Sequence, residues 1–242
     1  MKFEIKGFTP LTTIDWSGKL AAMLFIGGCN FRCPYCQNPD LVINLAQTPA
    51  LDWEEIWNNL KERGKWLDGV IVGGGEPTLY PKELKRMLER IKSLGYPVKI
   101  DTNGSQPAVI EQLIAGNEPL VDFVAMDIKT SLYKYSRATR ITDKKVEQRI
   151  DQTIDYILDS GVEYEFRTTV VPNYAGKEEI PEVANYLGKK GAKNYVLQPF
   201  DPRVTLDVEA KFVEPYSKDT LENLLQECKK ILPTNLRFPE SF

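Results

Sequence analysis

Cys29-Asn30-Phe31-Arg32-Cys33-Pro34-Tyr35-Cys36 places three thiols in one short stretch, directly after the apolar run Leu24-Phe25-Ile26. Thiolates at this close spacing, C-x3-C-x2-C, bind either an iron–sulfur cluster or zinc. A structural zinc ion takes four ligands, and the only other cysteine of the chain, Cys228, is far away in the sequence. We therefore predict an iron–sulfur cluster that has one iron left open.

Cys228 has a simpler explanation than metal binding. It falls at helical spacing with Leu221, Leu224, Leu225 and Ile231, which predicts a helix whose apolar face packs on the core. A free cysteine on such a face behaves as a small apolar residue. Zinc held by all four cysteines, and thiols without any ligand, remain the alternatives.

Composition limits the classes of protein to consider. The chain has 242 residues, of which 42% are hydrophobic and 27% charged, which is enough to form a full core in a single α/β barrel. A net charge of −3 gives no basic surface for nucleic acid or an anionic membrane. No apolar run approaches about 20 residues, and the start, residues 1–4, lacks a secretory hydrophobic region. We expect a cytoplasmic protein that does not associate with membranes.

The complete absence of histidine is informative. It removes Ser–His and Cys–His nucleophilic catalysis, histidine general bases and histidine-ligated zinc. The chemistry must therefore come from cysteine, carboxylates, lysine, arginine, tyrosine, the backbone or a cofactor.

Apolar runs and helical patterns alternate along the chain. After a short strand and turn in the first twenty residues, we expect strands at 20–26, 69–72, 98–100, 121–128, 164–171 and 195–197. Helices are expected after each of them, the first one capped by Asp52 with Glu55 in a capping-box position. Such alternation predicts an α/β fold, an incomplete (β/α)6 barrel similar to a TIM barrel. A doubly wound sheet is the alternative, although no Rossmann fingerprint follows the first strand. We expect one domain over 1–242, with a core at about 18–200 and a C-terminal helix and tail at 215–242.

Unusual residues follow nearly every predicted strand. Because active sites of α/β barrels form at the carboxyl ends of the strands, these distant groups are expected to converge. The cysteines follow the strand at 20–26, and the glycines with Glu76 follow the strand at 69–72. The other groups at strand ends are Asp101 with Asn103, Asp127 with Lys129, and Gln198 with Asp201.

The stretch Gly73-Gly74-Gly75-Glu76-Pro77 is open to two interpretations. It is either a flexible turn or a place where backbone approaches a ligand and its carbonyls accept from an ammonium group. It lacks the lysine of a phosphate-binding loop. Beside a cluster, it indicates a site for a small zwitterion.

Charged residues at the other strand ends suit a polar ligand. Asp101 and Asp127 are suited to ribose hydroxyls, an ammonium group or a hydrated cation, although each is equally explained as a structural cap. Lys129 and Arg167 would attract a carboxylate, with surface salt bridging as the alternative for Lys129. Arg167 lies inside an apolar strand, where a purely structural role is hard to explain.

These residues together resemble a known family. The loop from Gly28 to Pro39 resembles the C-x3-C-x-aromatic-C signature of radical S-adenosylmethionine (SAM) enzymes, and Gly74-Gly75-Glu76-Pro77 resembles their GGE motif. Asp101-Thr102-Asn103-Gly104 and Asp127-Ile128-Lys129 are similar to the DTNG and D-x-K motifs of glycyl-radical-enzyme activases. The chain is most similar to the activases of anaerobic ribonucleoside-triphosphate reductase, in part through residues 12–19, and is related to those of pyruvate formate-lyase.

The resemblance implies specific roles. Cys29, Cys33 and Cys36 would hold three irons of a [4Fe–4S] cluster, and the fourth iron would chelate SAM. Tyr35 would lie near the adenine of SAM, and Gly74, Gly75 and Glu76 would meet the methionine ammonium. Asp101 and Asp127 would lie near the sugar and a monovalent cation, and Lys129 and Arg167 at the carboxylate or sulfonium. Asn103 is a further residue expected to bind the cofactor.

The implied reaction is reductive cleavage of SAM to a 5′-deoxyadenosyl radical, which removes hydrogen from a glycine of a partner protein. The partner would be a glycyl radical enzyme such as anaerobic ribonucleotide reductase, with a flavodoxin or ferredoxin as electron donor. A radical SAM enzyme that modifies a small molecule or RNA is the alternative. The chain departs from pyruvate formate-lyase activases at residues 15–18, and it has Asp201 where they have a histidine.

Overall fold

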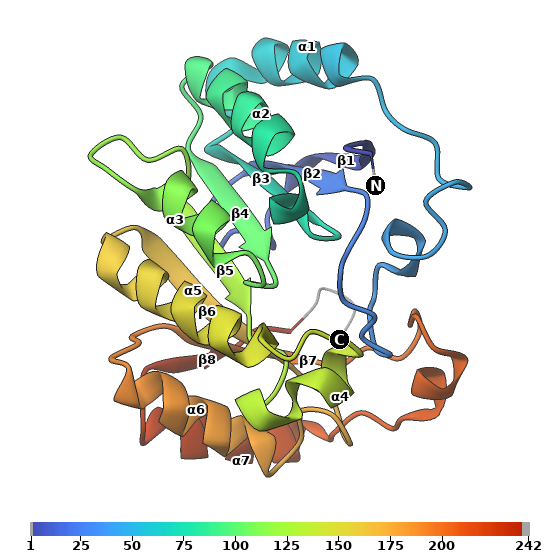
Figure 1. The fold of residues 1–242 in the computed structure, drawn as a ribbon, viewed down its shortest axis with the longest axis vertical. Helices are drawn as coiled ribbons and strands as arrows, with labels where there is room; N and C mark the ends of the chain where they lie inside the picture. Colours follow the sequence, from blue (N-terminus) through green and yellow to red (C-terminus); the bar gives the residue numbers. More distant parts are fainter. Residues whose placement is uncertain (1, 239–242) are drawn as a thin grey trace.

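A curved sheet of eight strands forms the centre of the molecule (Figure 1). The computed structural model describes residues 2–238. Neighbouring strands follow chain order, and all pairs are parallel except the first, because β1 runs antiparallel to β2. The strands are β1 (Ile5–Thr12), β2 (Ala21–Ile26), β3 (Gly69–Gly74), β4 (Val98–Thr102), β5 (Phe123–Asp127), β6 (Glu163–Val170), β7 (Tyr195–Pro199) and β8 (Thr234–Leu236).

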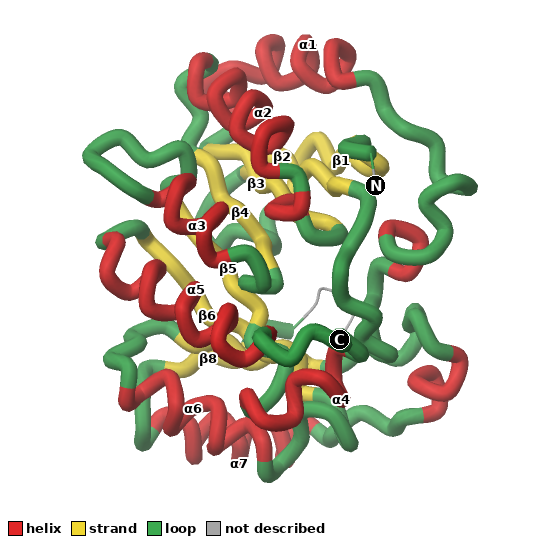
Figure 2. Tube along the Cα trace, viewed as in Figure 1, coloured by secondary structure: helices red, strands yellow, loops and turns green. Residues whose placement is uncertain are grey.

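The helices cover the outside of this sheet, from α1 and α2 at one end to α6 and α7 at the other (Figure 1). They are α1 (Trp53–Arg63), α2 (Pro81–Ser93), α3 (Pro107–Ile114), α4 (Tyr135–Thr139), α5 (Val146–Ser160), α6 (Glu179–Lys189) and α7 (Lys218–Lys229). Short 3-10 turns occupy Pro39–Leu41, Gly64–Trp66, Pro77–Leu79, Leu132–Lys134 and Val208–Phe212. Long loops with short helical turns lie on the right of the view, next to α4 (Figure 2).

Local signals fix several helix ends. Asp52 caps α1 by accepting a 2.6 Å hydrogen bond from the Glu54 amide, and Gly64 ends that helix with a positive φ of 46°. Ser217 caps α7 through the Thr220 amide. Gly161 ends α5 in the left-handed conformation.

The predicted incomplete barrel is confirmed. The six strands expected from the sequence correspond to β2–β7, and their parallel pairing in chain order places each connecting helix on the same face. A doubly wound sheet would reverse its strand order part-way, so that alternative is wrong. The single domain over 1–242 stays a prediction, and its final residues, 239–242, lie outside those described.

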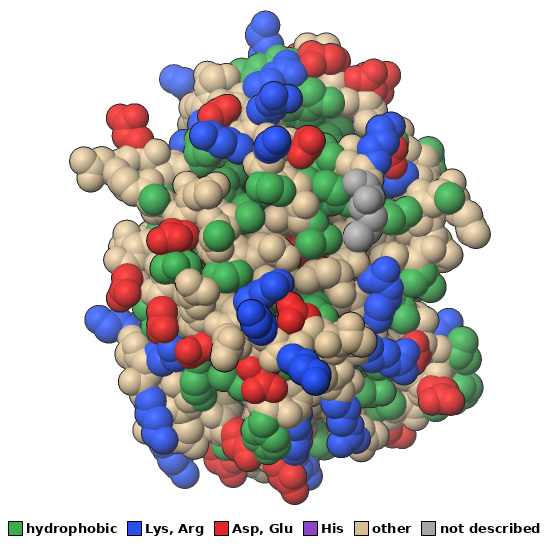
Figure 3. Space-filling view, in the orientation of Figure 1, with side chains coloured by type: hydrophobic (Ala, Val, Ile, Leu, Met, Phe, Trp, Pro, Cys, Tyr) green, Lys and Arg blue, Asp and Glu red, His purple; other side chains and the backbone are tan. Residues whose placement is uncertain are grey.

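Two edge strands complete the sheet. The sequence predicted only a short strand near the start and none near the end, yet β1 spans Ile5–Thr12 and β8 adds to β7. Within residues 2–238, β1 and β8 are not paired with each other, so the barrel stays open along this seam. Acidic and basic side chains are interspersed on the face shown in Figure 3. No described helix has the length and apolar character needed to cross a membrane.

Cys228 lies in α7 with no exposed surface and packs in the main core. Burial raises the pKa of its thiol to about 12. The prediction that it is a core residue is confirmed.

We expect Cys228→Ala to lower the free energy of unfolding by about 1 kcal/mol, because it removes one buried atom from a packed site. Iron bound after anaerobic reconstitution should equal that of the wild type. Urea denaturation of the metal-free protein and an iron assay check the two parts. A loss of iron would show that Cys228 is a ligand.

Candidate active site

A cavity of about 350 Å³ opens at the carboxyl ends of the parallel strands. It brings together residues from β2 to β7 that are far apart in the sequence. Its lining includes Cys29, Cys33, Tyr35, Cys36, Gly74, Gly75, Asp101, Asn103, Asp127, Lys129 and Arg167, and also Asp15, Met23, Phe25, Phe31, Gln37, Asn38, Val42, Thr102, Thr169 and Gln198.

The end of β3 holds the cysteine loop in place. The Glu76 amide donates to the Gly28 carbonyl at 2.7 Å, and the Gly75 amide donates to the Ile26 carbonyl at 2.8 Å. A Cβ at Gly75 would lie 2.0 Å from the Gly28 carbonyl oxygen, so only glycine allows this approach. Arg32 folds back on the loop and donates to the Cys29 carbonyl at 2.6 Å.

The three thiols lie close enough to influence one another. Burial raises the pKa of Cys29 to about 11 and that of Cys33 to about 12, and neighbouring cysteines add to both shifts. Cys29 and Cys33 are therefore protonated at neutral pH, so metal binding must displace their protons. Cys29 Sγ accepts a 3.4 Å hydrogen bond from the Phe31 amide.

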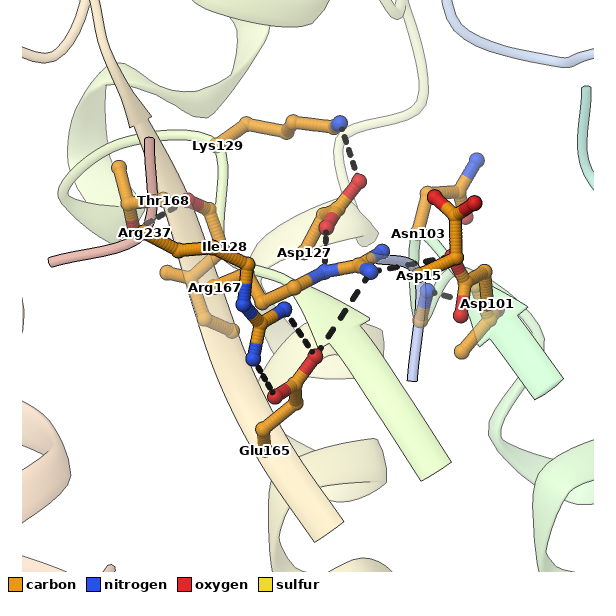
Figure 4. Close-up of polar contacts among 12 residues, drawn as sticks. Asp15, Asp101, Asn103, Asp127, Ile128, Lys129, Glu165, Arg167, Thr168 and Arg237 are labelled. Carbon is orange, nitrogen blue, oxygen red and sulfur yellow. Dashed lines mark hydrogen bonds and ion pairs between the residues drawn. The ribbon is translucent and has the colours of Figure 1, made fainter. Parts of the chain in front are cut away.

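Arg167 lies between two carboxylates at the floor of the cavity (Figure 4). Its Nε donates to Asp127 at 2.8 Å and its Nη1 to Asp101 at 3.0 Å. Burial alone would raise the pKa of Asp127, but Arg167 and Lys129 outweigh it and lower the pKa to about 2. Arg167 and Lys99 likewise lower the pKa of Asp101. Both acids are therefore ionised at neutral pH.

Lys129 lies beside the cysteine loop. Its Nζ pairs with Asp127 at 2.9 Å, and the Tyr35 hydroxyl donates to its carbonyl at 3.3 Å. Burial opposes its charge, but Asp127 and nearby acidic groups raise its pKa well above the usual value. Lys129 thus brings a fixed positive charge to the cavity wall.

A second layer of charge beneath the cavity was not predicted. Arg237, directly after β8, forms two hydrogen bonds of 2.9 and 2.6 Å with Glu165 on β6 (Figure 4). Lys99, with 1% of its side chain exposed, pairs with Asp101 at 3.2 Å and lies 3.8 Å from Glu165. The sequence signal was available, because charged Lys99 and Glu165 interrupt predicted strands.

Glu76 is placed differently from the other expected site residues. It is fully buried and is absent from the cavity lining, although its neighbours Gly74 and Gly75 are present. Its carboxylate accepts from the Thr78 amide and hydroxyl, from the Thr102 hydroxyl at 2.8 Å and from the Asn103 amide at 2.6 Å. Glu76 therefore joins the end of β3 to that of β4.

Asp201 also lies apart from the thiols. It pairs with Arg203 and lines a neighbouring cavity of about 400 Å³. Sequence reasoning did not assign Asp15 or Thr169 to the site, although both line the thiol cavity and its neighbour.

Comparisons with known proteins agree with this geometry. The family model described as the radical SAM superfamily matches residues 23–187. A candidate glycyl-radical enzyme activating enzyme of Methanocaldococcus jannaschii is 36% identical over 233 residues, covering 96% of this chain and 92% of the relative. The chain belongs to the radical SAM superfamily. The pyruvate formate-lyase-activating enzyme of Clostridium pasteurianum is 26% identical, covering 95% of this chain and 98% of that enzyme.

Solved structures share the fold. A radical SAM methyltransferase from Sphaerobacter thermophilus superposes with a TM-score of 0.72 at 15% identity, covering 95% of this chain and 69% of that one. Streptococcus suis SuiB gives a TM-score of 0.65 at 14% identity, and the chain spans 47% of its length. At these identities the likeness shows the fold alone.

Radical SAM enzymes use a [4Fe–4S] cluster and SAM, and the cavity fits both. Three thiols line one wall, while the fourth cysteine of the chain is buried in α7. The two oxygens of Asp101 pair with Lys99 at 3.2 Å and with Arg167 at 3.0 Å, which holds this carboxylate charged at the cavity wall. Charges of both signs suit the zwitterionic end of SAM.

We expect Glu76→Ala to lower the free energy of unfolding of the metal-free protein by about 3 kcal/mol, because it leaves several buried donors without an acceptor. Glu76→Gln should cost less, since one acceptor oxygen remains. Exposed Glu83→Ala, in the first turn of α2, is the matched control and should change stability by less than about 0.5 kcal/mol. Urea denaturation measures all three. Unchanged stability in Glu76→Ala with weakened SAM binding would place Glu76 at the ligand instead.

Proposed function

We propose that this radical SAM enzyme activates a glycyl radical enzyme by removing a hydrogen atom from a glycine of that partner. Support comes first from the relative that is 36% identical over nearly the whole chain. The structure adds a second line of support, because the barrel is open between β1 and β8.

The observation that carries the proposal is the junction of two cavities. The thiol-lined cavity and its neighbour share Asp15, Gln37, Arg167, Thr169 and Gln198. The neighbouring cavity also includes Ile14, which follows β1, and Phe238, which follows β8. The two cavities therefore adjoin, and the second one reaches the unpaired seam, where a loop of another protein could enter.

The cavity residues take the following proposed roles. Cys29, Cys33 and Cys36 hold the cluster, which when bound supplies the electron that cleaves SAM to methionine and a 5′-deoxyadenosyl radical. Backbone carbonyls of Gly74 and Gly75 accept from the methionine ammonium. The remaining SAM contacts are Lys129 and Arg167 at the carboxylate, Asp101, Asn103 and Asp127 around the ribose, and Tyr35 at the adenine.

The chain's own groups orient the ligand. The ion pairs of Arg167 with Asp101 and Asp127 hold both carboxylates charged in a buried setting. Paired charges of this kind do not need to reorganise when a polar ligand arrives. The monovalent cation stays a prediction, since Arg167 already bridges the two acids that would bind it.

The finer details are also proposals. Anaerobic ribonucleotide reductase is the proposed partner, a flavodoxin or ferredoxin is the proposed electron donor, and the cytoplasm is the proposed location. Asp201 and Arg203 lie toward the seam, where a partner loop would pass, and we propose that they contribute to its recognition.

We expect Lys129→Met to weaken SAM binding by about tenfold or more, because a charge-assisted hydrogen bond to the carboxylate contributes about 1.5–3 kcal/mol. Lys134→Met is the control, since Lys134 pairs with Glu179 and does not line the cavity. Calorimetric titration of the reconstituted proteins with SAM measures both constants. Equal constants for Lys129→Met and the wild type would remove Lys129 from the SAM site.

The function itself is tested with a partner protein. Reconstituted enzyme, dithionite and SAM, mixed with glycyl radical enzymes from the same genome, should yield a glycyl radical signal in electron paramagnetic resonance. A glycine-to-alanine variant of the responding partner and Cys33→Ala of this chain should abolish it. If no candidate partner gives a glycyl radical signal, and a small molecule or RNA is altered instead, the alternative activity is favoured.

A further inference from the structure

A ring of polar side chains lies beside Cys29. The Asn103 Nδ2 donates to Asn30 Oδ1 at 2.9 Å and lies 3.8 Å from Cys29 Sγ, within hydrogen-bond range for sulfur. Asn30 Nδ2 donates to Ser105 Oγ at 2.9 Å, and the Ser105 amide donates back to Asn103 Oδ1 at 2.9 Å. The side chains of Asn103, Asn30 and Ser105, together with the Ser105 backbone amide, thus form a closed ring beside Cys29.

The orientation of the Asn103 amide follows from its partners. The Ser105 backbone N–H can only donate, so the Asn103 atom facing it must be the oxygen. The NH₂ group is then forced toward Asn30 and Cys29. Asn103 is 6% exposed, and its own backbone amide is held at 2.6 Å by buried Glu76, so the side chain has little freedom to turn away.

Cys29 differs from the other two cysteines in its hydrogen bonds. Its sulfur receives the Phe31 amide at 3.4 Å and the Asn103 side chain at 3.8 Å. Among residues 2–238, no N–H group donates a hydrogen bond to the sulfur of Cys33 or Cys36. Hydrogen bonds to ligand sulfurs stabilise the more electron-rich, reduced state of an iron–sulfur cluster.

We propose that Asn103 is a positioning residue for the cluster, and that the hydrogen bond from its side-chain N–H group to Cys29 Sγ raises the reduction potential of that cluster. The step it favours is uptake of one electron from a low-potential one-electron donor, with no bond made or broken and no proton transferred. The proposal gives Asn103 a role apart from SAM. It rests on Cys29 being a cluster ligand and not on the identity of the partner.

The test is an anaerobic redox titration without SAM or partner, followed by electron paramagnetic resonance and normalised to bound iron. Asn103→Leu keeps the side-chain size but removes the donor. At a fixed potential, its ratio of reduced to oxidised cluster should fall about tenfold, equivalent to 59 mV for one electron. Asn30→Ala is the matched control, because it breaks the ring but leaves the Asn103 N–H facing Cys29, and it should match the wild type.

The possible results separate the alternatives. A wild-type potential in iron-replete Asn103→Leu overturns the proposal, as does an equal shift in Asn30→Ala, which would assign the effect to loop position. If Asn103→Leu binds no cluster, pulsed resonance on the reduced wild-type protein labelled with ¹⁵N-asparagine decides. A side-chain nitrogen coupling supports the proposal and its absence overturns it. Full iron content in Cys29→Ala would instead refute the ligand set.

Discussion

The contact between the end of β3 and the cysteine loop is the constraint on which the site depends. Gly75 and Gly28 approach so closely that any side chain at 75 would collide with the carbonyl of 28. The Glu76 amide then bonds to that carbonyl, and the Glu76 carboxylate bonds to the turn after β4. One short segment therefore fixes the cysteine loop and the Asn103 turn together, although they are distant in the sequence.

The interior of the barrel carries paired charges where many barrels carry apolar layers. Moving ions out of water costs several kcal/mol each, so buried charges persist only where partners and hydrogen bonds compensate. Here Arg167 and Arg237 are shared among Asp101, Asp127 and Glu165, with Lys99 between two of these acids. Such a network adds little to stability compared with a packed apolar core. Its benefit is a rigid, ionised floor for a charged ligand.

The sequence predicted most of the fold because the spacing of apolar residues distinguishes helices from strands, and the position of polar residues marks the strand ends. Strands alternate with helices, and a parallel arrangement brings strand ends together, so Cys29, Asp101 and Asp127 were correctly expected to meet. For a residue in a loop after a strand, such as Glu76, the sequence does not indicate where the side chain points. Glu76 belongs to a motif associated with ligand binding, yet it turns into the core because four donors converge on it there. The short strand β8 was missed since only three residues pair, and with it the contact of Arg237 with Glu165.

Because β1 and β8 are not paired within residues 2–238, one end of the cavity is enclosed and the other is open, and the two ends suit different ligands. At the closed end, Cys29 and Asn103 are fixed by backbone and by a satisfied polar ring, which suits a resident cofactor that must keep one geometry. At the seam, Ile14 and Val204 are 43% and 50% exposed in a cavity that Asp201, the ion-pair partner of Arg203, also lines. Exposed apolar residues at an opening favour a substrate that brings its own apolar surface, as a protein loop does. A free small molecule would instead be expected to need enclosure on that side. The contrast between a rigid closed end and an open end with exposed apolar side chains among polar ones is a structural reason to favour a macromolecular substrate.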